Sequence, residues 1–229
     1  MKRRIKIQSS FVFVFLILSF FFSKYFFARY RIQLVDIFLD VAGMGILICG
    51  FLFRISARGY KQDNTAGGNE LVTGGPYSLI RNPMYFGTFL IGSGIILIIL
   101  NLWTYPLFLA IYLSIYVPQI RSEKKVLSGR FGEKYLEYCK RVPAYFPGLS
   151  GFLEGELRQF LPLKWRWVKK ELPSFTAVGI IVTAIEVWED LAASASSNIA
   201  CSVLELPLIA ACLFLMVFIY YRKNGNKPQ

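Results

Sequence analysis

Two polar stretches stand out in this chain: residues 71–85, LVTGGPYSLIRNPMY, and residues 121–147, RSEKKVLSGRFGEKYLEYCKRVPAYFP. Both are rich in Gly, Pro, Arg and Tyr, whereas most of the surrounding sequence is apolar. A single apolar stretch, long enough for a membrane hairpin, separates them. We therefore expect the two stretches to meet at one end of a helical bundle and to build a site there.

The composition favours a membrane protein. Of the 229 residues 55% are hydrophobic, and the mean hydropathy is +0.48. Runs of roughly 18 or more apolar residues are long enough to cross a bilayer core. Six candidate spans lie at residues 10–28, 34–53, 85–101, 102–118, 174–191 and 200–221. The predicted fold class is therefore all-α, a polytopic integral membrane protein with about six transmembrane helices.

The basic residues are distributed asymmetrically. The chain has 26 Lys and Arg against 14 Asp and Glu, a formal charge of +12. If the N-terminus is cytoplasmic, all basic residues except Lys24, Arg29 and Arg31 fall on the cytoplasmic side, the positive-inside pattern of multi-pass proteins. We therefore predict that both termini are cytoplasmic. Because the charge gathers where spans leave the bilayer, we expect a lipid bilayer and no nucleic acid as partner.

The sequence contains no histidine, and its four cysteines show no CxxC spacing. It therefore indicates neither a metal site nor a disulfide framework. The lack of histidine also excludes a His general base and a Ser-His-Asp triad.

Local signals bound the polar stretches. Asn82 and Pro83 are typical of a helix start, with Asn as N-cap and Pro at the first helical position. The free N–H groups of such a start can bind a carboxylate. A helix break is expected at Gly132, and Pro143 should end the helix that follows.

The flanking segments carry further signals. Residues 54–70 are expected to be a polar connection, and residues 148–173 a segment at the membrane surface. Gly43, Gly45 and Gly50 would let a neighbouring helix approach closely.

The residue types of the two stretches suit an S-adenosylmethionine site that faces the cytoplasm. The ammonium of this cofactor needs a carboxylate, and Glu123 is the best-placed candidate. The cofactor's own carboxylate would suit the helix start at residues 82–84. Tyr77 and Tyr85 could pack on adenine or line the methyl path. An anionic acceptor would be oriented by arginines, namely Arg81, Arg121 and Arg141.

The missing histidine is compatible with methyl transfer to a carboxylate. Such an acceptor is already ionised at neutral pH and needs no base, so alignment and charge stabilisation supply most of the catalysis. A site in the membrane makes sense for a lipidic acceptor, because each buried methylene contributes roughly 0.8 kcal/mol. We therefore expect a membrane lipid or a lipid-modified substrate.

At these residues the sequence resembles the isoprenylcysteine carboxyl methyltransferases, integral membrane enzymes that use S-adenosylmethionine. The family pattern is LVTxGxY, RHPxY with Gly two residues on, a membrane hairpin, a Glu-rich stretch and FGxxYxxYxxRVPxxxP. This chain has LVTGGPY, RNPMYFG, a hairpin, RSEKK and FGEKYLEYCKRVPAYFP in that order. The resemblance implies a methyltransferase core at residues 62–150. Residues 1–61 would hold two transmembrane helices, and residues 151–229 an interfacial segment and two more.

The resemblance also implies roles for individual residues. Cofactor contacts are implied at Gln62, Asn69, Glu70, Leu71, Val72, Tyr77, Asn82, Pro83, Met84, Tyr85 and Glu123. Arg81 and Arg141 match arginines close to the reacting carboxylate and are the expected catalytic residues. The acceptor-binding arginine of the family falls at Gln119, so we expect substrate binding at Gln119 and Arg121.

Two departures from the family pattern leave the acceptor open. Asn82 stands in place of the usual histidine, and Lys124 stands where many relatives carry a second Glu. Two other functions also stay open. One is an NADPH-dependent reductase of sterol-like lipids, because such reductases share the C-terminal FG…Y…P pattern. The other is a non-catalytic membrane scaffold that has lost activity. The oligomeric state stays unknown at this point.

Overall fold

The computed structural model describes residues 33–65, 70–99, 101–147 and 160–192. Within these ranges all regular secondary structure is helical, which confirms the predicted all-α class. The helices are α3 (Gln33–Asn64), α4 (Pro76–Leu79), α5 (Pro83–Ile99), α6 (Thr104–Phe131), α7 (Glu133–Arg141) and α10 (Trp165–Ala192). The predicted spans at residues 10–28 and 200–221 lie outside the described residues.

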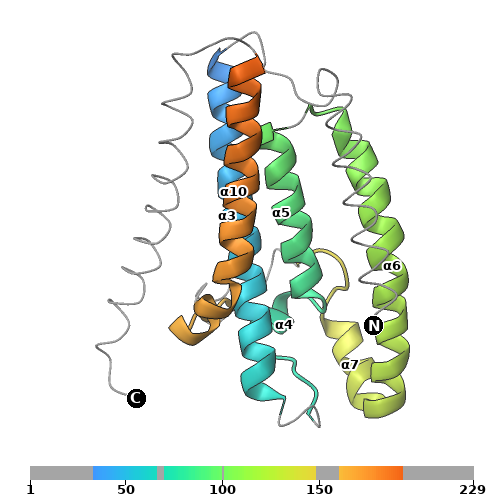
Figure 1. Cartoon of the computed structure of the whole chain (residues 1–229). Coiled ribbons are helices and arrows are strands. Elements are labelled where there is room, and N and C mark those ends of the chain that lie inside the picture. Colours follow the sequence, from blue (N-terminus) through green and yellow to red (C-terminus); the bar gives the residue numbers. More distant parts are fainter. Residues whose placement is uncertain (1–32, 66–69, 100, 148–159, 193–229) are drawn as a thin grey trace.

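The four long helices, α3, α5, α6 and α10, lie side by side and alternate in direction (Figure 1). α3 and α6 run towards the end of the bundle at which the short helices α4 and α7 lie, and α5 and α10 run away from it. Residues 71–85 and 121–147 therefore lie at the same end of the bundle, as the sequence predicted.

The contact between α3 and α5 is the most extensive between described helices. A Cβ atom added to Gly43 would lie 2.9 Å from the carbonyl oxygen of Gly94, and one added to Gly50 would lie 2.7 Å from that of Gly87. Glycine at these points therefore lets the two backbones touch. Gly45 faces open space, so two of the three predicted glycines serve the close approach.

Two helices are longer than predicted. α3 continues to Asn64 instead of giving way to a polar connection at residue 54, and Ile55, Ser56 and Ala57 in this part are buried. α6 continues through Pro118 to Phe131, although proline removes one helical hydrogen bond. The predicted fourth span and the helix after it are thus one helix. The break at Gly132, with φ 53°, is confirmed.

The start of α10 corrects a second prediction. Residues 165–173 are not separate from the following span, because they form the first turns of α10; their place at the membrane surface stays a prediction. Trp167 is 3% exposed and packs against Gly59 of α3, where an added Cβ would lie 2.0 Å from its ring. This indole fixes the start of α10 to the bundle.

One helical stretch in the described residues, Phe38–Asn64 of α3, is long and apolar enough to cross a membrane, judged by length and composition alone. α5 is also apolar but has 17 residues. The predicted number of spans and their orientation stay predictions.

Candidate functional site

Backbone and side-chain hydrogen bonds join the two polar stretches at the start of α5. The Arg81 N–H donates to the carbonyl oxygen of Pro143 at 2.9 Å. The Asn82 side-chain Nδ2 donates to the carbonyl oxygen of Ala144, also at 2.9 Å. The RNP residues of the first stretch therefore hold the RVPA residues of the second.

The first turn of α5 offers an anion fewer donors than the sequence predicted. α5 begins at Pro83, as expected, and proline has no N–H. The N–H groups of Tyr85 and Phe86 both donate to the Asn82 carbonyl oxygen at 3.1 Å. This leaves the N–H of Met84 as the donor in this turn that an anion could use.

Glu123 lies across from α5 and is bound by two neutral donors. The Tyr85 hydroxyl donates to Glu123 Oε1, and Gln119 Nε2 donates to the same oxygen at 2.7 Å. The Tyr85 carbonyl in turn accepts the Tyr112 hydroxyl at 2.9 Å. Glu123 is half-buried and forms no ion pair with a described residue. Its negative charge is therefore available to a cation.

An apolar cavity of about 230 Å³ lies beside this cluster, between α5, α6 and the loop after α7. Phe146 of that loop packs on Phe86 and Phe89 of α5, with ring centroids 6.3 and 6.2 Å away. The cavity is lined by Asn82, Tyr85, Phe86, Phe89, Leu109, Tyr112, Leu113, Val117, Ile120, Ala144, Tyr145 and Phe146. It suits an apolar chain, with Tyr85 linking it to Glu123.

Arg81 lies among tyrosines and a cysteine at α7. Its Nη1 donates to Sγ of Cys139 at 2.8 Å, and its Nε is buried without a hydrogen-bond partner. The Tyr138 hydroxyl donates to the carbonyl oxygen of Tyr77 at 2.6 Å, which ties α7 to α4. No carboxylate of a described residue pairs with Arg81. The guanidinium therefore has charge to offer to an anion.

The hydroxyl groups around Arg81 stay protonated at neutral pH. Burial is the main cause that raises the pKa of Tyr135 to about 12, and the neighbouring Cys139 acts in the same direction. The Arg81 charge acts in the opposite direction. Burial also raises the pKa values of Tyr77 and Tyr138 well above the usual range. These groups therefore serve as hydrogen-bond donors and not as bases.

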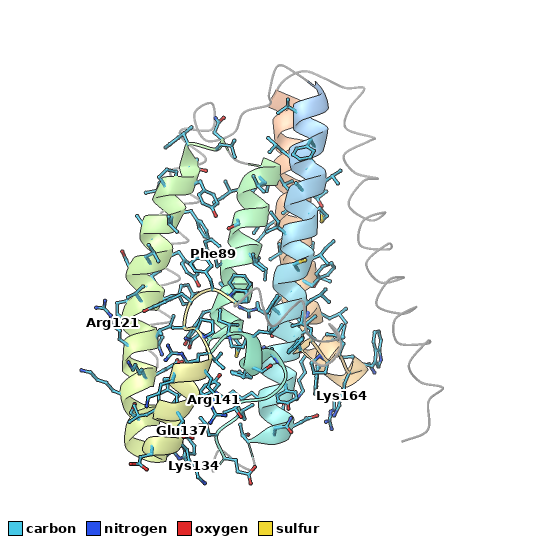
Figure 2. The ribbon with its side chains drawn as sticks, turned by 180° about the vertical axis from the view of Figure 1, so that it is seen from behind. Phe89, Arg121, Lys134, Glu137, Arg141 and Lys164 are labelled. Carbon is cyan, nitrogen blue, oxygen red and sulfur yellow. The ribbon has the colours of Figure 1, made fainter. Side chains whose placement is uncertain are left out.

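A second, polar hollow of about 460 Å³ lies between α7 and the residues around α4. Two predicted site residues, Leu71 and Arg141, line it. Arg141 is 76% exposed, and its Nη2 lies 3.3 Å from Oε2 of Glu137; Figure 2 shows both side chains at this end of the bundle, near Lys134. Two other predicted residues, Asn82 and Tyr85, line the apolar cavity.

Several predicted residues line neither space. Oε1 of Gln62 accepts a hydrogen bond of 2.6 Å from Nζ of Lys170 at the exposed end of α3. Arg121 is exposed and projects from α6 away from α5 (Figure 2). Of the other predicted cofactor contacts, Glu70 is exposed, Val72 is half-buried and Asn69 lies outside the described residues.

The ionic contacts of Arg54 and Arg58 were not predicted from the sequence, because residues 54–70 were interpreted as a connection. Both arginines contact Glu171 of α10. A spacing of four residues places two side chains on one helix face, and this spacing was the signal that could have found them.

Comparison with known proteins bears on the region that contains this site. Residues 39–134 match the family model of phospholipid methyltransferases. The chain is 38% identical over 82 residues to the cobalt-zinc-cadmium resistance protein CzcN of Cupriavidus metallidurans. It is 41% identical over 86 residues to the nickel-cobalt-cadmium resistance protein NccN of Alcaligenes xylosoxydans xylosoxydans. Each alignment covers 36% of this chain and 38% of the relative.

A third relative carries the name expected from the motifs. The chain is 35% identical over 110 residues to the protein-S-isoprenylcysteine O-methyltransferase of Xenopus laevis, which covers 46% of this chain and 35% of the relative. The predicted resemblance to isoprenylcysteine carboxyl methyltransferases is thereby confirmed. No solved structure matches the chain significantly.

The matches are partial. The chain spans little more than a third of the length of these curated relatives. The family match includes Tyr85 and Glu123 and ends before α10. Two relatives are named for metal resistance, but among the described residues no three His, Cys, Asp or Glu side chains form a group that could hold a metal ion. The matches to the phospholipid methyltransferase model and to the protein-S-isoprenylcysteine O-methyltransferase of Xenopus laevis support a methyltransferase.

Proposed function

We propose that this chain is an integral membrane methyltransferase that uses S-adenosylmethionine and methylates a carboxylate of a lipidic acceptor. The observation that carries the proposal is the setting of Glu123. Its carboxylate accepts from two neutral donors, Tyr85 and Gln119, beside an apolar cavity. A cationic cofactor and a lipid chain could therefore bind next to each other, and Tyr85, Gln119 and Glu123 lie within the segment that matches the methyltransferase family.

The residues present fit the proposed cofactor. Glu123 has no basic partner in the described structure, so its carboxylate can pair with the ammonium group. The Met84 N–H at the start of α5 suits the cofactor's carboxylate. Tyr85 and Tyr116, with ring centroids 5.1 Å apart, offer aromatic surface to adenine. When bound, S-adenosylmethionine supplies a methyl group on a positively charged sulfur.

Arg81 is the residue that we propose to hold the acceptor carboxylate. Its buried Nε lacks a partner, and a planar guanidinium can pair with both oxygens of a carboxylate. Because that carboxylate is ionised at neutral pH, no residue of this chain has to remove a proton from it. Arg141, exposed on α7, is proposed to add positive potential on the side of the polar hollow.

The surface of the bundle supports a bilayer location for the proposed enzyme. Phe38 and Val41 of α3 and Ile180 of α10 are 70%, 68% and 69% exposed. Large apolar side chains on an outer face are favourable against lipid. We propose a multi-pass arrangement with both termini in the cytoplasm and the lipid chain of the acceptor in the cavity between α5 and α6.

Transfer of a labelled methyl group tests this proposal. Protein in lipid nanodiscs, supplied with cofactor that carries a labelled methyl group, should label a lipid product that alkali hydrolyses to volatile methanol, as expected of a methyl ester. Glu123→Gln should abolish the transfer. The matched control, Glu133→Gln, changes an exposed carboxylate of α7 and should leave it intact.

Other outcomes of this experiment contradict the proposal. A label that resists alkali would indicate an amine acceptor instead of a carboxylate. Oxidation of NADPH would indicate a reductase. Well-folded protein that binds neither cofactor would indicate a scaffold.

A further inference from the structure

α10 contributes a buried carboxylate to the bundle. Glu171 is 1% exposed, and its Oε1 lies 2.5 Å from Nη1 of Arg58 on α3. Its Oε2 has no hydrogen-bond partner and lies 3.7 Å from Nη2 of Arg54. A buried carboxylate is stable only when cations compensate its charge, so Glu171 and the two arginines depend on each other.

The contacts of Arg54 continue from this pair to α5. Its Nη1 donates to the Thr88 hydroxyl at 2.6 Å, and that hydroxyl donates to the carbonyl oxygen of Met84 at 3.0 Å. Met84 directly precedes Tyr85, whose hydroxyl is bound to Glu123. Polar contacts therefore connect Glu171 to the turn of α5 that carries the proposed cofactor contacts.

The packing around Arg54 restricts its side chain. A Cβ atom added to Gly87 would lie 2.8 Å from Cγ of Arg54. The Arg54 side chain therefore passes directly over the α5 backbone at Gly87, where α3 and α5 touch. Its side chain is 26% exposed, which leaves a route for the guanidinium to turn towards water. The charge of Glu171 favours the position in which Arg54 reaches Thr88.

We propose that Glu171 is a positioning residue for the first turn of α5 and acts through Arg54 and Thr88. This inference rests on the proposed function for its consequence, tighter binding of S-adenosylmethionine. It assigns a role in the site to α10, which lies outside the segment that matches the methyltransferase family.

The Glu171 ion pairs could have a purely structural role, which is to attach α10 to α3. A matched control separates this role from the proposed one. Asp63 of α3 also pairs with the start of α10, with 2.8 Å to Arg166 and 3.1 Å to Lys164. These exposed pairs join the same two helices but do not reach Thr88. Asp63→Asn should therefore loosen α10 as a structural role would, without changing the first turn of α5.

The test compares Glu171→Gln, Thr88→Val, the double variant and Asp63→Asn in two measurements. The first is amide hydrogen exchange of the cofactor-free protein. Exchange at Tyr85 and Phe86, whose N–H groups bond to Asn82, should become faster in Glu171→Gln and in Thr88→Val. Exchange in the double variant should be no faster than in either single variant, and exchange in Asp63→Asn should equal that of the wild type.

The second measurement is cofactor affinity. Each single variant should weaken it about 10-fold, as expected for one hydrogen bond to a charged group. The double variant should be no weaker than either single variant, because both interrupt the same connection. Additive losses, or equal effects of Asp63→Asn, would overturn the proposal.

Two further outcomes keep the proposal separate from folding and from the proposed function. If Glu171→Gln does not fold, Arg54→Lys is the substitute variant. Lysine keeps a charge beside Glu171 but lacks the second guanidinium nitrogen that donates to Thr88. Arg54→Lys should therefore speed amide exchange at Tyr85 in the same way. Unchanged exchange in Arg54→Lys would overturn the proposal. If the wild type binds no cofactor, the proposed function fails, while the exchange measurement still decides whether Glu171 positions α5.

Discussion

Gln119 donates a hydrogen bond of 2.7 Å to the Glu123 oxygen that also accepts the Tyr85 hydroxyl. Gln119 and Glu123 are four residues apart on α6 and thus lie on one face of the helix. An arginine at position 119, as in the family pattern, would compensate the charge of Glu123 at this spacing. The neutral amide orients the carboxylate and leaves its charge for a cationic ligand. The geometry therefore favours Gln119 as a partner of Glu123 over its predicted contact with the acceptor.

Gln119→Arg should weaken S-adenosylmethionine binding about 10-fold, because the new guanidinium competes with the cofactor's ammonium for Glu123. Calorimetry on detergent-purified protein measures the effect. Ser122→Arg adds the same charge at a neighbouring exposed position and should change the affinity little. Equal or tighter binding in Gln119→Arg would show that Glu123 does not hold the ammonium.

Gly50→Ala should destabilise the fold by about 1–3 kcal/mol, the usual cost of an overpacked contact. The added methyl group would lie 2.7 Å from the Gly87 carbonyl oxygen, which belongs to backbone. Gly45→Ala is the control, since this position is open and alanine favours helix. Thermal unfolding should separate the two variants, and equal melting temperatures would mean that α3 and α5 do not touch at Gly50.

Arg81→Lys should lower the turnover of methyl transfer about 10-fold or more while leaving cofactor affinity almost unchanged. Lysine keeps the charge but loses the planar pair of donors that suits a carboxylate. Arg141→Ala, at a side chain that is 76% exposed, should have the smaller effect. A loss of cofactor affinity in Arg81→Lys, with normal turnover at saturation, would reassign Arg81 to the cofactor.

Asn82→His should keep the loop after α7 in place, whereas Asn82→Ala should loosen it. The Asn82 Nδ2 group holds the Ala144 carbonyl at 2.9 Å, and a histidine N–H can replace this donor. Hydrogen exchange over residues 142–147 measures the difference. Equal exchange in both variants would mean that this bond does not hold the loop.

Local structure near the site follows well from the sequence. Asn82 and Pro83 predicted the start of α5, and Gly132 and Pro143 predicted the limits of α7, because these residues restrict their own backbone. Glu123 and Tyr85 were each selected as cofactor contacts, but their mutual hydrogen bond was not predicted. Which of two distant side chains meet depends on how the helices pack.

The polar contacts of α10 show the same limit more clearly. Glu171 and Arg58 are 113 residues apart, and nothing in either local pattern specifies the partner. Residues 54–70 were interpreted as a connection because of their polarity, yet Arg54 and Arg58 are neutralised within the bundle and α3 continues. Polarity alone does not separate a loop from a helix whose charges are paired with a buried carboxylate.

Calorimetry of S-adenosylmethionine binding shows whether Glu123 holds a cationic cofactor. Wild type, Glu123→Gln and Glu133→Gln should be compared in the same detergent, with folding verified by circular dichroism. We expect saturable binding in the wild type and in Glu133→Gln, and a loss of affinity of at least about 10-fold in Glu123→Gln. Equal affinity in wild type and Glu123→Gln, or no binding by well-folded wild type, would contradict it.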